Sequence, residues 1–355
     1  MKNPGIVFTK INTAELIDTD LPAVTGDLVK IKTAVTTVSA GTERANIIGS
    51  DSVQGIKAAN VTFPRSAGYS AAGIVVEVGE DVKDIRPGDR VIGFWTKHKY
   101  FNVIPASRVV KIPDEVSFSL AAQVFVATFP MAAIRKCRVE TGEPALVMGL
   151  GILGQYAVRL LRAAGAVPII AVDPVASKRA DALRGGADFV LDPYEEGFAD
   201  EVKKLTGGGA AVAIEVTGVG AGLDGALDCM AKHGRIALLG CTRDKNFTID
   251  YYRKVHCPGI TLIGAHTNAR PEHESHPGYF THRDDIAAIL KMLCYSRVFF
   301  DNLPVEMYSP TECGAVYTRL INDKNFPPVV QFDWLGRGEA AVMQGVASDD
   351  EEEVY

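Results

Sequence analysis

The sequence predicts an α/β protein that combines a small β-barrel with a doubly wound parallel sheet, and three observations support this. The 355 residues are about two domains' worth of chain. Up to about residue 116, short β-branched segments alternate with Gly, Pro and Asp, as in a small irregular barrel. From Ala145 onward, apolar segments alternate with amphipathic helices, which is the pattern of a parallel sheet covered on both faces.

In the first part of the chain, four segments are expected to be strands and one a helix. The strands are Leu28 to Val35, Gly73 to Val78, Arg90 to Ile92 and Val109 to Ile112, and Arg86-Pro87-Gly88-Asp89 is a strong turn signal. The segment Leu120 to Cys137 is rich in alanine and favours a helix.

The second part begins with the apolar segment ALVMGLG at Ala145. A helix is expected from Gln155 to Gly165, because Ala157, Leu160, Leu161 and Ala164 fall on one face. The next apolar segments are VPIIAVD, ADFVLD, AVAIEVTG, RIALLG and ITLIG. After a polar loop we expect a helix from Asp284 to Ser296 and a last strand from Val329 to Trp334.

This order predicts a discontinuous first domain, residues 1–118 and 269–336, interrupted by a second domain, residues 119–268. Residues 337–355 are expected to be an acidic, disordered tail, with a partner-binding motif as the alternative. The tail residues Asp349, Asp350, Glu351, Glu352 and Glu353 carry five of the six net negative charges. The remainder is nearly neutral, so we expect no nucleic-acid or membrane partner.

Composition places the chain among ordinary globular proteins, with 47% hydrophobic and 23% charged residues. The six cysteines contain no CxxC pair, so we expect reduced thiols and a cytoplasmic protein. The N-terminus has no apolar signal region, and the most apolar stretch, Ala145 to Asp173, is interrupted by Arg159 and Arg162. Neither a signal peptide nor a membrane span is therefore expected.

A dinucleotide site is predicted where Gly149, Gly151 and Gly154 fit the pattern GxGxxG between a buried strand and a helix. The first glycine allows a tight turn, the second lets a pyrophosphate approach, and the third allows close helix–strand packing. The free N–H groups at the helix N-terminus favour an anion. The expected cofactor contacts in this region also include Ile152, Leu153, Thr217 and Gly240.

Asp173 follows the next apolar segment, 19 positions after Gly154, where an acid can accept hydrogen bonds from a ribose diol. Its charge would repel a 2′-phosphate, which favours NAD over NADP. Lys178 and Arg179 keep NADP possible, with a solvated helix face as the alternative role. The competing interpretation of the whole pattern is a glycine-rich turn in another α/β protein, with Asp173 as a helix cap.

Over residues 1–336 the chain resembles the medium-chain dehydrogenase/reductase superfamily. The resemblance rests on GYSAAGIVVEVGEDVKDIRPGDRV (residues 68–91), the Gly149–Gly154 pattern and the segment GRIALLG. It implies a GroES-like catalytic domain with the substrate site and a Rossmann domain that binds the nicotinamide cofactor. It also implies a homodimer or homotetramer.

The zinc ligands of the well-known alcohol dehydrogenases in this superfamily have no counterparts here. At the three corresponding places the chain has Ser39, Tyr69 and Phe125, which do not supply a tetrahedral donor set. The four-cysteine lobe for structural zinc is also missing, since residues 91–109 contain no cysteine. We therefore expect no catalytic or structural zinc. The segment VSAGTER resembles a zinc-less branch that includes bacteriochlorophyllide hydroxyethyl dehydrogenases and sugar- or polyol-type dehydrogenases.

Without a metal, a side chain must handle the hydroxyl proton during hydride transfer. The resemblance places Ser39, Glu43, Tyr69 and His98 near the reacting carbon, with Tyr69 donating a hydrogen bond to the substrate oxygen and His98 passing the proton to water. Trp95 and Arg44 are expected to line the substrate site. The alternatives are a Glu43–Arg44 ion pair or helix cap, core packing for Tyr69 and Trp95, and a surface loop for His98.

Four histidines follow the last predicted strand of the Rossmann domain: His266, His273, His276 and His282. His273 and His276 have a ligand-like spacing, but no helix is expected in this Pro/Gly-containing loop, so a metal site is disfavoured. A substrate-binding loop is preferred, with His266, Arg270, His273 and His276 as hydrogen-bonding groups.

The sequence therefore predicts a zinc-independent, NAD-dependent dehydrogenase, with NADP possible, acting on a secondary alcohol or ketone of a sugar- or polyol-like substrate. Two alternatives stay open. One is an NADPH-dependent quinone or enoyl reductase. The other is a non-catalytic nucleotide-binding protein.

Overall fold

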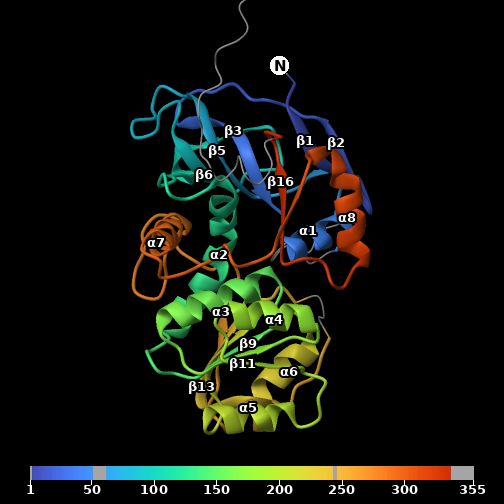
Figure 1. Ribbon diagram of the computed structural model, residues 1–355, viewed down its shortest axis with the longest axis vertical. Coiled ribbons are helices and arrows are strands. Elements are labelled where there is room, and N and C mark those ends of the chain that lie inside the picture. Colours follow the sequence, from blue (N-terminus) through green and yellow to red (C-terminus); the bar gives the residue numbers. More distant parts are fainter. Residues whose placement is uncertain (1, 51–60, 243–245, 337–355) are drawn as a thin grey trace, which may run out of the picture.

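The computed structural model describes residues 2–50, 61–242 and 246–336, which form two lobes bridged by a long helix (Figure 1). The predicted acidic tail lies outside the described residues.

The first lobe is built on sheets that are antiparallel except for one parallel strand pair, Val305–Tyr308 with Val329–Asp333. Its strands are β1 (Pro4–Lys10), β2 (Thr13–Asp18), β3 (Leu28–Thr37), β4 (Arg65–Ser66), β5 (Ser70–Val78), β6 (Arg90–Phe94), β7 (Phe101–Pro105), β8 (Val109–Lys111), β15 (Val305–Tyr308) and β16 (Val329–Asp333). They form a small sheet, β2-β1-β4, and a larger one, β15-β16-β3-β5-β6-β8, with β7 also paired to β3. In β3, Val29 and Ile31 are buried while Lys30 and Lys32 alternate with them, as the period of a strand requires.

The second lobe is a six-stranded parallel sheet ordered β11-β10-β9-β12-β13-β14. Its elements are β9 (Ala145–Met148), α3 (Ile152–Ala164), β10 (Ile169–Val172), α4 (Ala176–Arg184), β11 (Phe189–Leu191), α5 (Phe198–Thr206), β12 (Ala210–Glu215), α6 (Gly220–Asp228), β13 (Met230–Leu238) and β14 (Thr261–Gly264). Figure 1 shows α3 and α4 on the side of the sheet nearer the first lobe and α5 on the other. In β9, Ala145 and Val147 pack on one side while Leu146 and Met148 pack on the other. This is the doubly wound Rossmann arrangement that the alternating sequence predicts.

Helix α2 (Phe118–Cys137) joins the lobes and packs against both α3 and β5. It is long and apolar enough to span a membrane, but 78% of its apolar window is buried inside the protein. Its composition is therefore explained by its place in the core. Ser117 caps its N-terminus by accepting a hydrogen bond from the Leu120 amide at 3.2 Å.

The chain returns to the first lobe after the parallel sheet. Helix α7 (His282–Cys294) packs beside α2, and β16 pairs antiparallel with β3, with Gln331 opposite Thr37. Helix α8 (Cys313–Asn322) lies near α1 (Ala40–Ile47) (Figure 1). Segments hundreds of residues apart thus meet around the loop that precedes α1. The helix η3 (Tyr252–His256) and the short turns η2 (Ala106–Arg108) and η4 (Pro310–Glu312) complete the described elements.

Candidate active site

The glycine turn between β9 and α3 has the geometry of a phosphate cradle. Gly149 has φ +100°, which favours glycine. A Cβ on Gly154 would lie 1.9 Å from the Gly149 carbonyl oxygen, so helix and turn approach too closely for any side chain. A Cβ on Gly151 would meet nothing within 4 Å, so the turn is open at the N-terminus of α3. A dinucleotide pyrophosphate fits this open, N–H-rich position.

Asp173 stands at the end of β10, beside the same turn. Its Oδ2 accepts a hydrogen bond from the Leu150 amide at 2.8 Å, and its Oδ1 accepts one from the Val175 amide at 2.9 Å. The carboxylate therefore holds the turn in place, and each oxygen keeps a second lone pair for a ribose hydroxyl.

The basic residues that kept NADP possible have other partners. Arg179 donates to the Asp173 carbonyl oxygen at 2.7 Å and to Asp192 Oδ2 at 2.9 Å. The Lys178 ammonium lies 3.4 Å from the Lys324 carbonyl oxygen.

The other predicted cofactor residues surround the switch point between β9 and β12, where the strand order reverses. Thr217 follows β12 and donates its amide to Glu215 at 2.7 Å. Gly240 follows β13, and a Cβ there would lie 2.5 Å from the Gly218 nitrogen. Ile152 and Leu153 form the first turn of α3. Open α/β sheets bind their ligands at the carboxyl ends of the strands that flank such a switch point.

A second polar cluster lies in the first lobe, around the buried carboxylate of Glu43. Its Oε1 accepts a hydrogen bond from the Ser39 amide at 2.8 Å, and its Oε2 lies 3.1 Å from His98 Nε2. The Tyr317 hydroxyl donates to the same carboxylate. The Tyr69 hydroxyl donates to Ser39 Oγ, which links it to the cluster. The structure thus brings together all four predicted catalytic side chains.

Tyr69 is held in its neutral form. Burial raises the pKa of Tyr69 above its ordinary value, and the negative charge of Glu43 acts in the same direction. A neutral tyrosine is a hydrogen-bond donor at working pH.

Two expectations for this cluster need correction. His98 is fully buried, so it lies neither in a surface loop nor in contact with bulk water, and it cannot hand a proton directly to solvent. Its Nδ1 is buried without a partner among the described residues. Glu43 does not pair with Arg44, whose guanidinium donates to the Ile321 carbonyl oxygen at 3.1 Å. Glu43 is buried, and its carboxylate is turned toward His98 instead of Arg44.

The sequence analysis missed Tyr317, which lies on α8, 274 positions from its partner Glu43. No local pattern marks this residue, because only the return of the chain to the first lobe brings α8 beside α1.

Trp95 contributes to an aromatic wall. Its ring centroid lies 5.7 Å from that of Tyr69 and 5.1 Å from that of Phe125. Phe129 stacks on Tyr69 at 5.8 Å. The structure therefore places Trp95 beside Tyr69 and against the core, and its role as a substrate-lining ring stays a prediction.

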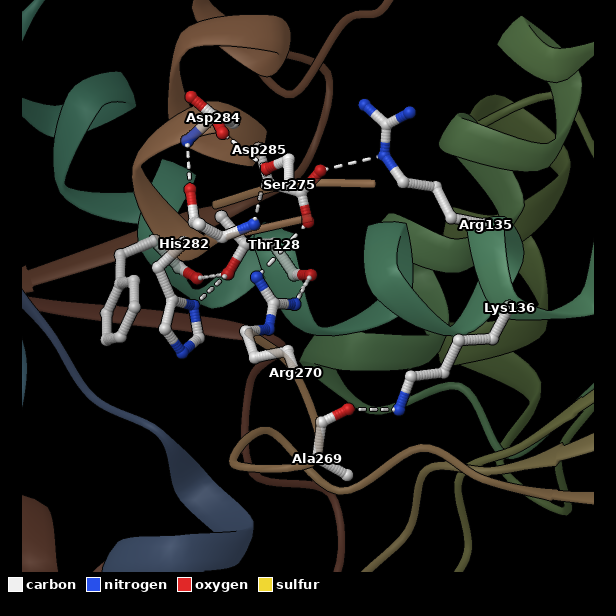
Figure 2. Close-up of polar contacts among 11 residues, drawn as sticks. Thr128, Arg135, Lys136, Ala269, Arg270, Ser275, His282, Asp284 and Asp285 are labelled. Carbon is white, nitrogen blue, oxygen red and sulfur yellow. Dashed lines mark hydrogen bonds and ion pairs between the residues drawn. The ribbon is translucent and has the colours of Figure 1, made fainter. Parts of the chain in front are cut away.

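The predicted substrate-binding loop after β14 has a different organisation. Arg270 is directed inward, donating to Asp285 Oδ2 at 3.2 Å and to the Thr128 carbonyl oxygen at 2.9 Å (Figure 2). His273 is 95% exposed, and His276 stacks on Tyr279 at 5.1 Å. His266 Nδ1 accepts a hydrogen bond from the Asn268 amide at 3.2 Å. Arg270 therefore holds the loop in place, since a buried guanidinium needs a carboxylate partner, and it is not free to bind a substrate.

The residues at the predicted zinc positions do not fit a zinc ion. Ser39 and Tyr69 are hydrogen-bonded to each other, and Phe125 packs edge-on against Tyr69 at 5.7 Å without a donor atom. Across residues 2–50, 61–242 and 246–336, no three His, Cys, Asp or Glu side chains gather in a way that could hold a metal ion.

Comparison with known proteins now identifies the family. A sequence model of the alcohol dehydrogenase GroES-like domain matches residues 29–114, and one of the zinc-binding dehydrogenase family matches residues 153–277. The chain belongs to the medium-chain dehydrogenase/reductase superfamily, to which the zinc-type alcohol dehydrogenases also belong. The first match falls within the first lobe, and the second covers most of the parallel sheet of the second lobe.

Among curated relatives, D-guloside 3-dehydrogenase of Escherichia coli is 32% identical over 207 residues, which are 58% of this chain and 59% of that protein. The (R,R)-butanediol dehydrogenase of Bacillus subtilis is 31% identical over 187 residues, 45% of this chain and 54% of that one. The chain thus spans between half and two thirds of the length of these relatives. The crystal structure of an Escherichia coli oxidoreductase of unknown specificity superimposes with a TM-score of 0.81 at 19% identity, covering 94% of this chain and 99% of the other. This likeness concerns the fold.

Proposed function

We propose that this protein is a zinc-independent oxidoreductase that transfers a hydride between NAD(H) and a secondary alcohol or ketone of a sugar- or polyol-like substrate. The observation that carries the proposal is the hydrogen-bonded pair Tyr69–Ser39, which stands at two of the positions that the family resemblance assigns to zinc ligands. The sugar- and diol-oxidising relatives support the substrate class.

The cofactor would be held by the open turn at Gly151 and by the free lone pairs of Asp173. Once bound, the nicotinamide ring accepts or donates the hydride. The negative charge of Asp173 would repel the 2′-phosphate of NADP. Arg179, which could otherwise bind that phosphate, is already paired with Asp192. Both features favour NAD.

Tyr69 is proposed to hold the substrate oxygen. In the direction of reduction, the single hydroxyl hydrogen of neutral Tyr69 turns from Ser39 Oγ to the carbonyl oxygen, which gains negative charge as the hydride adds to carbon. Ser39 can then donate its own hydroxyl hydrogen to Tyr69 Oη. In the direction of oxidation, the hydride leaves the carbinol carbon, and the hydroxyl proton leaves the oxygen and finally reaches solvent. Ser39 and the Glu43–His98 pair orient the Tyr69 hydroxyl behind this oxygen.

The decisive experiment measures steady-state turnover with polyols, sugars, quinones and enones in the presence of NAD(H) or NADP(H). We expect alcohol oxidation with NAD+, unchanged by a chelator, and a loss of about 10²- to 10⁴-fold in kcat for Tyr69→Phe. Cofactor affinity should stay nearly the same in this variant, since Tyr69 is not part of the glycine turn. His98→Ala should also lower kcat, through the orientation of Glu43.

Tyr194→Phe is the matched control, because Tyr194 is 85% exposed and its loss should leave kcat unchanged. Full turnover of Tyr69→Phe would remove this residue from the mechanism. Turnover confined to quinones or enones with NADPH would replace the proposal by its reductase alternative. Cofactor binding without turnover of any substrate would favour a non-catalytic nucleotide-binding protein.

Cofactor choice is tested separately by isothermal titration. Wild type should bind NAD(H) more tightly than NADP(H), and Asp173→Ala should narrow the ratio of the two affinities. The ratio is the informative quantity, because loss of the hydrogen bond from the Leu150 amide should lower the affinity for NAD(H) and NADP(H) alike. Tighter binding of NADP(H) by wild type would show that the interpretation of Asp173 is wrong.

A further inference from the structure

Glu215 is a buried carboxylate at the carboxyl end of β12 that has no part in the proposed reaction so far. It is 3% exposed. In the sheet it lies opposite Met148, the last residue of β9, and Gly149 follows directly as the start of the glycine turn. Since neighbouring strands are about 4.8 Å apart, Glu215 lies one strand away from the proposed pyrophosphate position.

The hydrogen bonds of Glu215 all go to one of its two carboxylate oxygens. Oε1 accepts from the Thr217 amide at 2.7 Å, from the Gly218 amide at 3.2 Å and from the Thr217 hydroxyl. Among the residues that the structure describes, Oε2 has no hydrogen-bond partner, and no Lys, Arg or His side chain pairs with the carboxylate. The charge of Glu215 is therefore stabilised by neutral donors and is not neutralised by a cation.

These donors favour the ionised form of Glu215. Burial raises the pKa of its carboxyl group, and the three hydrogen bonds to Oε1 act in the opposite direction. An ionised carboxylate oxygen can only accept hydrogen bonds, and three donors directed at the same oxygen fit this form. The carboxyl end of β12 thus carries a negative charge.

This charge lies in the half of the sheet where the nicotinamide is expected. A doubly wound sheet binds one mononucleotide half of the cofactor on each side of its switch point. Asp173, after β10, marks the adenosine half, which leaves the carboxyl ends of β12, β13 and β14 for the nicotinamide half. The Thr217 methyl group would lie 3.0 Å from a Cβ on Gly149, so the segment that Glu215 holds packs directly against the glycine turn.

The two redox forms of the cofactor differ in charge at the nicotinamide ring. The ring is a cation in NAD+ and neutral in NADH, whereas the pyrophosphate and both riboses are the same. Hydride transfer from the carbinol carbon brings two electrons and one proton to the ring, so its positive charge disappears in the reaction. A fixed negative charge nearby therefore stabilises bound NAD+ but not bound NADH.

We propose that the charge of Glu215 strengthens the binding of NAD+ relative to NADH and so makes oxidation of the alcohol the favoured working direction. This inference rests on the proposed function. Glu215 then discriminates between the two redox states of the cofactor, whereas Asp173 discriminates between NAD and NADP. The equilibrium between free alcohol and free ketone is unaffected, because the charge acts only on the bound cofactor.

The first test is Glu215→Gln in the full chain, with the affinities for NAD+ and NADH measured by isothermal titration at pH 8. The glutamine amide oxygen can take the place of Oε1 and keep its three donors, and the amide nitrogen can take the place of Oε2. The substitution therefore removes the charge with little change in hydrogen bonding. The dissociation constant of NAD+ should rise about 10-fold relative to that of NADH, which is the order expected for one charge at ~10 Å and an effective dielectric constant of ~20.

Two further variants separate the charge from its structural effect. Glu215→Ala also removes the acceptor for Thr217 and Gly218, so both affinities should fall, and NAD+ should again lose about 10-fold more than NADH. Glu140→Gln is the matched control, because Glu140 is exposed in the loop before β9, at the amino ends of the strands. Its ratio of the two affinities should equal that of wild type.

Equal loss of both affinities in Glu215→Gln and Glu215→Ala would show that Glu215 only supports its loop, and it would overturn the proposal while the cofactor site stands. A shift of the ratio toward NAD+ would also overturn it. Failure of wild type to bind either form of the cofactor would instead count against the proposed function, and the inference would fall with it.

Discussion

Glu43 and Asp285 are two buried carboxylates on either side of α2, and their partners differ completely. Glu43 is 2% exposed and receives its hydrogen bonds from a backbone amide, an imidazole and a phenol. Asp285 is fully buried and is paired with two guanidinium groups, those of Arg135 and Arg270. The same functional group at similar burial is thus placed in two different electrostatic environments.

The difference separates a structural role for Asp285 from the chemical role that we propose for the Glu43 cluster. Asp285 forms ion pairs with Arg135 and Arg270, which are both permanently charged. This ion cluster connects the start of α7 and the loop after β14 to α2 (Figure 2). The Lys136 ammonium reinforces it with a 2.9 Å hydrogen bond to the Gly264 carbonyl oxygen. The partners of Glu43 carry exchangeable protons and lead, through Ser39, to Tyr69. A buried carboxylate is therefore informative about chemistry only together with its donors.

The largest expected effect is on stability, at Asp285. Asp285→Asn removes the charge that neutralises two guanidinium groups, and breaking a buried ion pair from one side costs about 3–5 kcal/mol. Urea denaturation should show this loss in the free energy of unfolding. The matched control is Asp250→Asn, because Asp250 pairs with the exposed Arg253, where about 1 kcal/mol or less is expected. Equal effects at the two sites would contradict the structural role of Asp285.

Glu43→Gln should lower the free energy of unfolding by about 1–3 kcal/mol, which is less than the loss expected for Asp285→Asn. The new amide nitrogen would face one of the groups that now donate to Glu43, but no guanidinium would be left without a carboxylate partner. Its second effect is on chemistry. Since the negative charge of Glu43 helps to raise the pKa of Tyr69, its removal lowers this pKa, and the alkaline limb of the kcat profile should move to lower pH. Asp285→Asn should leave the position of this limb unchanged. A shift in both variants, or in neither, would break the distinction between the two carboxylates.

The smallest effect concerns the pH dependence of stability at His282. The pKa of His282 is lowered to about 3 in the folded protein and lies near 6.5 in an unfolded chain. Between these values only the unfolded state binds the proton, so stability falls as pH falls, by at most about 1.4 kcal/mol per pH unit. Difference denaturation curves at pH 5 and 7 should show a smaller slope for His282→Gln than for wild type. His273→Gln should keep the wild-type slope, because His273 is in solvent.

The parallel-sheet lobe was predictable from the sequence almost element by element. Apolar segments predicted every strand from β9 to β14. The central strands β9, β10 and β12 are buried on both faces and are apolar for that reason, whereas the edge strands β11 and β14 are partly exposed. The glycine turn was equally predictable, since its requirements are local: a positive φ at Gly149 and a close approach at Gly154. The signal for His282 was also present, because Thr281 before two acidic residues is a helix-start pattern. The sequence analysis nevertheless placed His282 among loop residues.

The sequence by itself determined the fold class, the glycine turn and the types of residue at the former ligand positions, because these depend on neighbours along the chain. Only the tertiary structure decided which partners the polar residues have: Glu43 with Tyr317, Arg270 with Asp285, and the burial of His98. Buried charges and hydrogen-bonding groups must find partners wherever the fold supplies them, and here those partners come from helices that meet only when the chain returns to its first lobe.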